Sequence, residues 1–298
     1  MEFKSGFISI VGRPNAGKST LINQIVKQKI AIVSEKAQTT RDAIIGVRTE
    51  EDYQMIFIDT PGIHKPKHEL GERMNSASYA HFKGVDIIYY IIDGSQPFGK
   101  GDEFVIEKLK KVKLPVFLVI NKADLMEKDE MLLKIATFSD FEFTEIIPIS
   151  ALQDQNVDRL LDVTLDYLEE GVMYYPKEQV SAYPEQFIYA EIIREKILKL
   201  TEEEIPHSVA VAIEKIVKKD GSTIISAVIF VDRPSQKGMI IGKQGQMIKK
   251  IGILAREELE TIMGGKVYLE TYVRVEKNWR NRAKMLNQLG YIEIQYES

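Results

Sequence analysis

No part of this sequence limits the possible folds more than GRPNAGKST (12–20). It follows the apolar run FISIV (7–11) and precedes the amphipathic segment LINQIVKQ (21–28). Two glycines and a Lys-Ser pair between a buried strand and a helix fit the G-x-x-x-x-G-K-[ST] pattern of a phosphate-binding loop. The glycines let backbone N–H groups approach phosphates, and the helix N-terminus adds positive potential. A chance glycine turn with a solvated lysine is the alternative.

The rest of the N-terminal half alternates apolar runs with amphipathic segments. Buried strands are predicted at 7–11, 85–93, 115–120 and 145–150, with helical segments at 21–28, 103–111 and 131–138. Strands that alternate with helices indicate crossover connections and a mostly parallel sheet. The runs AIIGVR (43–48) and QMIFID (54–59) predict a hairpin added to that sheet.

A chain of 298 residues exceeds one typical core, so two domains are expected. Residues 171–186 lack a clear period and contain prolines, which indicates a linker between a domain at 1–170 and a domain at 187–298. The second domain is predicted to be small and α+β. Its expected elements are a helix at 187–200, strands at 209–217 and 223–231, helices at 247–252 and 254–263, a strand at 266–275 and a last helix at 278–291.

Composition excludes some classes of site. The chain has no cysteine, which rules out disulfides and thiolate chemistry. No apolar run approaches the roughly 18 residues of a membrane span, and the N-terminus lacks a signal-peptide core, so we expect a cytoplasmic protein. Weak peripheral contact with the inner face of the cell membrane stays open. The net charge is −4, yet residues 233–256 carry six basic and no acidic side chains, which favours nucleic-acid binding there.

The phosphate loop and the strand end at 59–62 predict a magnesium–triphosphate site. Lys18 would reach the β- and γ-phosphates, and Ser19 would ligate Mg²⁺. Asp59 would hold Mg²⁺ through a water, and the Gly62 N–H would meet the γ-phosphate; a tight turn is the alternative. The predicted phosphate-side residues are Gly12, Arg13, Pro14, Asn15, Ala16, Gly17, Lys18, Ser19, Thr20, Asp59, Thr60, Pro61, Gly62 and Ile63.

Two further strand ends predict the base. Asn121, Lys122 and Asp124 end the run PVFLVI, and a carboxylate there can accept from both N1–H and the 2-amino group of guanine. Ser150, Ala151 and Leu152 follow EIIPI, and a backbone N–H there would lie near guanine O6. A surface turn and a helix cap are the alternatives. In this order, at the carboxyl ends of parallel strands, the motifs specify guanine.

The motifs GRPNAGKS, TTRD, DTPG, NKAD and SAL, in this order, resemble the TrmE–Era–EngA branch of small GTPases. The resemblance implies a P-loop GTPase domain that hydrolyses GTP with Mg²⁺. It identifies residues 34–42 as the first switch, with Thr40 as the second Mg²⁺ ligand and Thr39 as the neighbouring alternative. It places the second switch at 60–82.

The catalytic apparatus departs from the Ras-like pattern. Ile63 stands where Ras-like proteins place a water-orienting glutamine, so we expect slow hydrolysis without an activating partner. Asn15 resembles the asparagine that holds a potassium ion in related GTPases, where the ion offsets transition-state charge. The alternative is that Asn15 tolerates a left-handed turn. The expected catalytic set is Lys18, Thr40, Gly62 and Asn15.

The second domain carries Gly242-Lys243-Gln244-Gly245 inside the basic stretch. This loop and the element order are similar to the type II KH fold, in which a G-x-x-G loop clamps about four nucleotides of single-stranded RNA. Ile240, Ile241 and Ile248 would form the apolar floor of that cleft. A helix-packing glycine pair with a solvated basic face is the alternative. The predicted RNA contacts are Arg233, Lys237, Gly242, Lys243, Gln244, Gly245 and Lys249.

The predicted last helix has one other set of basic residues. Arg280, Arg282 and Lys284 would add RNA backbone contacts or, as we favour, form the polar side of a helix that buries the residues Trp279, Met285, Leu286 and Leu289.

Together these features predict a monomeric, two-domain GTPase that binds single-stranded RNA. The resemblance implies that the RNA is the 3′ end of small-subunit ribosomal RNA and that the role is assembly of the small ribosomal subunit. Two alternatives from other classes are a metabolic P-loop enzyme, such as a kinase or RNA-stimulated ATPase, and a GTP-binding scaffold with negligible turnover.

Overall fold

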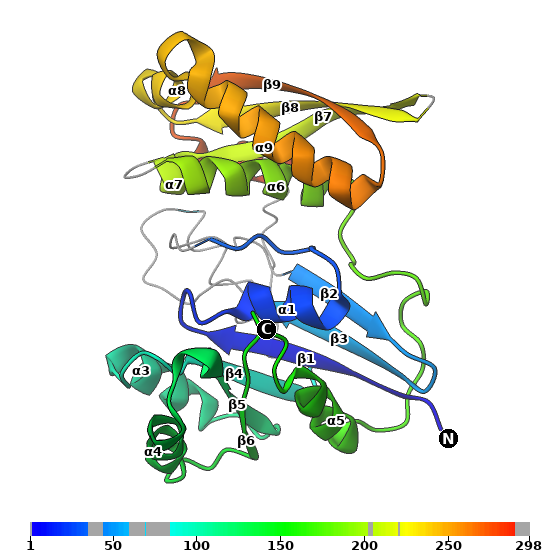
Figure 1. Ribbon diagram of the computed structural model, residues 1–298, viewed down its shortest axis with the longest axis vertical. Coiled ribbons are helices and arrows are strands. Elements are labelled where there is room, and N and C mark those ends of the chain that lie inside the picture. The colour runs from blue at the N-terminus through cyan, green and yellow to red at the C-terminus, as the bar shows by residue number, and fades with distance from the viewer. Residues whose placement is uncertain are drawn as a thin grey trace. The chain divides into compact units, whose positions relative to one another are not determined.

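The computed structural model describes residues 2–34, 44–59, 69, 84–201, 205–219 and 221–289 (Figure 1). The chain divides into two compact units, one drawn mainly from residues 1–182 and the other mainly from 183–298. Within the described ranges, no helix combines the length and the apolar character that a membrane crossing needs.

The first unit is built on a six-stranded sheet with the order β2-β3-β1-β4-β5-β6. Its strands are β1 (Lys4–Gly12), β2 (Ile44–Thr49), β3 (Tyr53–Asp59), β4 (Ile87–Asp93), β5 (Val116–Asn121) and β6 (Glu145–Pro148). All neighbouring strands are parallel except β2, which pairs antiparallel with β3. The predicted parallel sheet with an added hairpin is therefore confirmed.

Four helices flank this sheet in the described residues: α1 (Lys18–Val26), α3 (Lys100–Leu109), α4 (Lys128–Phe138) and α5 (Val157–Tyr167). The central strands are apolar without alternation because helices cover both of their faces. Ile8, Tyr89 and Phe117 are fully buried in this core. The parallel arrangement brings the carboxyl ends of β1, β3, β4 and β5 to one edge, where ligands bind in open α/β sheets.

Part of the predicted linker lies against β2 and β3. The Val47 N–H donates to Val180 O at 2.9 Å, and the Ala182 N–H donates to Ile45 O at 3.3 Å. The buried Gln54 carboxamide accepts from the Tyr174 N–H and donates to Tyr175 O. These bonds attach residues 174–182 to the first unit, and the linker boundaries stay a prediction.

The second unit has a three-stranded sheet, ordered β7-β8-β9, in which β7 and β8 are antiparallel and β8 and β9 are parallel. Helices α6 and α9 pack on one face of this sheet (Figure 1). The described elements are α6 (Glu185–Leu200), α7 (Ile205–Ser208), β7 (Ala210–Lys219), β8 (Ser222–Val231), α8 (Pro234–Ile241), α9 (Gln246–Met263), β9 (Lys266–Val275) and α10 (Ala283–Gln288).

The helices between β8 and β9 differ from the prediction. Residues 247–252 and 254–263 form one continuous helix, α9, and the other helix, α8, precedes the glycine loop. Gly252 lies inside α9, where a glycine costs only about 1 kcal/mol relative to alanine and does not end the helix. The G-K-Q-G loop therefore connects α8 to α9.

The predicted burial of apolar residues near the C-terminus is confirmed, but the single helix predicted at 278–291 is not. Trp279 lies in a 3-10 turn (Trp279–Asn281), and α10 begins at Ala283 after Arg282, which has an extended backbone. Trp279, Met285 and Leu286 are buried against Ala210, Val228 and Phe230, on the sheet face opposite α6 and α9. Leu289 is partly buried in the same cluster. The Trp279 indole N–H donates to Ser208 O at 2.9 Å, so the ring satisfies its one donor. On the polar side, Arg280 pairs with Asp232 at 2.8 Å.

Candidate functional site

The phosphate loop runs from the end of β1 to the start of α1. Gly17 has a φ of +96°, a backbone conformation that L side chains rarely adopt. A Cβ atom at Gly17 would also lie 2.0 Å from Asn121 Nδ2. The loop thus needs glycine here for both its conformation and its close approach to β5.

Three polar side chains from α1 and β3 meet beside the loop. The Lys18 ammonium donates to Gly12 O and Arg13 O, each at 3.1 Å. The Ser19 hydroxyl donates to Asp59 Oδ2 at 2.8 Å. The structure therefore brings together three of the residues predicted to hold a triphosphate and its cation, Lys18, Ser19 and Asp59.

Burial sets the electrostatics of this cluster. Burial lowers the pKa of Lys18, and the nearby Asp59 carboxylate acts against that shift. Burial raises the pKa of Asp59 to about 6, against the opposing effects of the Lys18 charge and the Ser19 hydrogen bond. The buried Asp59 Oδ1 has no hydrogen-bond partner among the described residues. A carboxylate oxygen left without a donor fits a hydrated Mg²⁺ ion, which prefers oxygen ligands and keeps its waters.

Asn121 connects the phosphate loop to the predicted base-binding loop. Its side chain is 2% exposed; Nδ2 donates to Ala16 O at 2.8 Å and Oδ1 accepts from the Ala151 N–H at 2.9 Å. One carboxamide thus fixes two segments that lie 135 residues apart in the chain, at positions 16 and 151. Its role in joining them was not part of the sequence prediction.

The segment after Asn121 is held in an unusual backbone conformation. Lys122 has a φ of +64°, and its ammonium pairs with Asp93 Oδ2 at 2.6 Å. Partial burial acts to raise the pKa of Asp93, but hydrogen bonds from Lys122 and Ser95 and the Lys122 charge hold it below its usual range. The Ala123 N–H donates to Ile149 O at 3.0 Å, which places Asp124 beside the 150–152 loop. Asp124 itself is exposed, as a base-binding carboxylate must be.

The 150–152 loop closes this end of the site. Ser150 is buried, and its hydroxyl accepts from the Gln153 N–H at 3.1 Å. Ser150 and Gln155 exchange backbone hydrogen bonds at 3.1 and 3.0 Å. Leu152, in contrast, is 74% exposed.

Arg13 has a partner that the sequence analysis did not anticipate. Its guanidinium pairs with the nearly buried Asp102 of α3 at 3.0 Å, and Asp102 also accepts from the Tyr90 hydroxyl at 3.1 Å. The Arg13 side chain thus anchors the phosphate loop to α3, while the Arg13 backbone remains part of the loop. An acidic residue in the first turn of α3 was the only available signal for this contact.

Several predicted residues lie outside the described ranges: Thr39, Thr40, Thr60, Pro61, Gly62 and Ile63.

In the second unit, both glycines of the G-K-Q-G loop have positive φ values, and Gly242 is also closely packed. Gly242 and Gly245 have φ values of +73° and +76°, and Gln244 between them has +51°. A Cβ atom at Gly242 would lie 2.6 Å from Met247 Cβ, whereas one at Gly245 would meet open space. Lys243 and Gln244 are exposed at the start of the 18-residue helix α9.

The predicted apolar floor of the cleft is wrong at one position. Ile240 is fully buried in the core under α6 and α9, so it cannot contact a base. Ile241 and Ile248 are partly exposed. Among the predicted RNA contacts, Arg233, Lys243 and Lys249 are exposed and Lys237 is partly exposed.

Comparisons with known families agree with both units. Residues 7–122 match the family described as 50S ribosome-binding GTPase, and residues 204–280 match the KH domain family. The chain is similar to a crystal structure of an Aquifex aeolicus Era variant bound to GDP and AlF4−. The TM-score is 0.91 and the identity 40%, over 97% of this chain and 99% of that chain. A structure of Era in complex with MgGDPNP and nucleotides 1506–1542 of 16S ribosomal RNA matches with the same TM-score, identity and coverage.

Proposed function

This chain belongs to the Era family of GTPases, and from that premise we propose that it couples GTP hydrolysis to binding of single-stranded RNA near the 3′ end of small-subunit ribosomal RNA. The role that follows is assembly of the small ribosomal subunit. The observation that carries the RNA part is the exposed G-K-Q-G loop between α8 and α9. The Era relative bound to 16S ribosomal RNA supports the RNA class.

In the nucleotide site, Lys18 and the backbone N–H groups of the loop would bind the β- and γ-phosphates of GTP. Ser19, together with Asp59 through a water, would hold Mg²⁺, with Thr40 as a further ligand. Bound there, Mg²⁺ supplies positive charge to the β- and γ-phosphate oxygens. During hydrolysis a water oxygen bonds to the γ-phosphorus while the bond to the β–γ bridging oxygen breaks, which gives GDP and phosphate. Lys18 would stabilise the charge that moves onto the bridging oxygen.

We propose that Asn15 contributes a potassium site to this reaction. Asn15 has a φ of +65°, a conformation that asparagine and glycine tolerate and alanine does not. Asn15→Gly therefore removes the side chain without straining the loop. Hydrolysis should be faster in potassium than in sodium at equal ionic strength, and Asn15→Gly should remove that difference while GDP affinity stays within about threefold. A potassium preference that survives Asn15→Gly would reduce Asn15 to a conformational role.

Family membership argues against the two alternative classes. A kinase or ATPase has no use for a carboxylate placed to read guanine, and a scaffold without turnover does not fit a GTPase family. A ribosomal RNA partner supports the expected cytoplasmic location. The monomeric state and the weak membrane contact stay predictions.

The RNA part is tested by a substitution that adds negative charge without a clash. Gly245→Asp enters open space in the loop, whereas Gly242→Asp would collide with Met247 and endanger the fold. We expect Gly245→Asp to weaken binding of a short single-stranded RNA by about tenfold or more, because a carboxylate repels the phosphates that the loop clamps. Fluorescence anisotropy with labelled RNA measures the effect, and GTP affinity should not change.

Gly84→Asp is the matched control. Gly84 also has a positive φ, +80°, and open space around its Cβ position, and it precedes β4 at the edge of the sheet away from the phosphate loop. This variant should bind RNA like the wild type. If Gly245→Asp bound RNA with unchanged affinity, the G-K-Q-G loop would not be part of the RNA-binding site.

A further inference from the structure

The sheet of the second unit has a second face that α6 and α9 do not cover. Val267, Leu269 and Val273 of β9 point into the core under the helices. Alternate residues of β9 therefore lie on the opposite face, because successive side chains of a strand point to opposite sides. Ser226 of β8 donates to Glu270 Oε2 at 3.0 Å, which confirms that their side chains share this opposite face.

In the described residues, the C-terminal segment covers only one end of this face. Trp279, Met285 and Leu286 pack on Ala210, Val228 and Phe230. Tyr268, which lies nearer the β7–β8 turn, and Tyr272, which pairs in register with Val228 beside the covered end, are 58% and 57% exposed. We call this uncovered part the open face. By register, its described residues are Lys215, Val217, Lys219, Ser222, Ile224, Ser226, Lys266, Tyr268, Glu270 and Tyr272.

The charge of the open face is positive. Lys215 and Lys219 of β7 pair in register with Ser226 and Ser222 of β8, so they lie on the same face as these serines. Lys266 of β9 also pairs with Ser222 and lies on this face. All three lysines are exposed. Among the described residues of the open face, Glu270 is the one acid, and its carboxylate already accepts from Ser226. At the covered end, Arg274 lies over the Phe230 ring at 5.7 Å and pairs with Glu214 at 3.6 Å.

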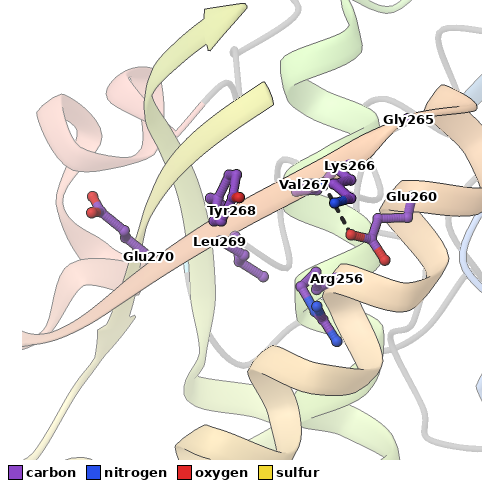
Figure 2. Close-up of a pocket in the computed structure, with 8 residues that line it drawn as sticks. All are labelled: Arg256, Glu260, Gly265, Lys266, Val267, Tyr268, Leu269 and Glu270. Atoms are coloured by element: carbon purple, nitrogen blue, oxygen red, sulfur yellow. Dashed lines mark hydrogen bonds between the residues drawn. The ribbon is translucent and has the colours of Figure 1, made fainter. Parts of the chain in front are cut away.

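The open face continues around the edge of the sheet. Strand β9 is the last strand of the sheet order, and Lys266, Tyr268 and Glu270 also line a groove with Arg256 and Glu260 of α9 (Figure 2). In this groove the Glu260 carboxylate accepts from the Val267 N–H at 3.1 Å (Figure 2). Arg256 and Lys266 are the two cationic residues that line it. The groove lies on the same helix, α9, that begins at the G-K-Q-G loop.

We propose that the open face is a second binding surface for single-stranded RNA, on which Tyr268 and Tyr272 stack bases while Lys215, Lys219 and Lys266 contact phosphates. This inference rests on the proposed function, because it extends the RNA path beyond the cleft. Aromatic side chains on an exposed sheet face stack bases in other RNA-binding folds, and surrounding lysines attract the backbone. A KH cleft clamps about four nucleotides. The RNA in the Era complex spans nucleotides 1506–1542, so an RNA of that length extends beyond the cleft and can reach a second surface.

The test compares a long RNA with a short one. The long probe is nucleotides 1506–1542 of 16S ribosomal RNA, and the short probe is a single-stranded oligonucleotide of about five nucleotides that only fills the cleft. The double variant Tyr268→Ala with Tyr272→Ala should bind the long RNA roughly 10- to 100-fold more weakly than the wild type, with unchanged affinity for the short RNA. The conservative pair Tyr268→Phe with Tyr272→Phe keeps both rings and should bind the long RNA within about threefold of the wild type.

A salt titration gives a second readout. Lys215→Ala with Lys266→Ala should reduce the slope of log affinity against log salt by about one to two for the long RNA, because fewer phosphates are neutralised. If the variant with both tyrosines changed to alanine bound the long RNA as tightly as the wild type, the proposal would be overturned. The open face would then be assigned to a protein partner instead. An equal loss of affinity for the long and the short RNA would overturn the proposal as well. Failure of the wild type to bind the short RNA would instead overturn the proposed function.

Discussion

Gly17→Ala is expected to lower nucleotide affinity by about 100-fold or more. The alanine Cβ would lie 2.0 Å from Asn121 Nδ2, and Asn121 cannot retreat without losing its bonds to Ala16 O and to the Ala151 N–H. The buried backbone groups left unpaired cost roughly 1–3 kcal/mol. The φ of +96° adds roughly 1–2 kcal/mol for any residue with a Cβ. Isothermal titration with GDP and Mg²⁺ measures the loss.

Gly99→Ala is the control for that experiment. Gly99 precedes α3 with an extended φ of −154°, and its Cβ position meets nothing within 4 Å. The Gly99 N–H that donates to Asp102 is retained in the alanine variant. Gly99→Ala should bind GDP like the wild type, so a loss restricted to Gly17→Ala isolates the loop. Wild-type affinity in Gly17→Ala would contradict the close contact between the loop and Asn121.

Much of the fold follows from local patterns in the sequence. Continuous apolar runs predicted the central strands because these strands are buried on both faces, and the glycine–lysine motif predicted the loop between β1 and α1. One of the boundary errors arose because a single residue was given too much weight. Gly252 suggested a break, yet the apolar face of α9 holds Ile251, Ala255 and Leu259 in the core across it.

The contacts that position the site were harder to predict because they join distant segments. Nothing near Arg13 in the sequence indicates Asp102, and nothing near Ala16 indicates Asn121; both contacts depend on the strand order. Ile240 was placed on the cleft floor because it neighbours the G-K-Q-G loop. Its side chain instead faces inward, since the helical turn of α8 directs Ile240 to the core and leaves the adjacent Met239 54% exposed.

The second large prediction concerns Asp124, whose carboxylate we expect to determine which base is bound. A carboxylate accepts from N1–H and the 2-amino group of guanine, whereas an asparagine amide offers one donor and one acceptor. Xanthine carries an oxygen in place of the 2-amino group, so it pairs with asparagine and repels aspartate. Unpaired polar groups at such a site discriminate between ligands by about 10³-fold or more. Asp124 is exposed and held by the Ala123–Ile149 bond, so Asp124→Asn should not disturb the fold.

Guanine recognition at the edge of the first sheet is the claim on which the GTPase function depends. Its most direct measurement is a competition between GDP and XDP for the wild type and for Asp124→Asn, in the presence of Mg²⁺. The wild type should prefer GDP and the variant should prefer XDP, a reversal of about 10³-fold or more in the affinity ratio. A variant that still preferred GDP over XDP would contradict the assignment of the guanine site to Asp124.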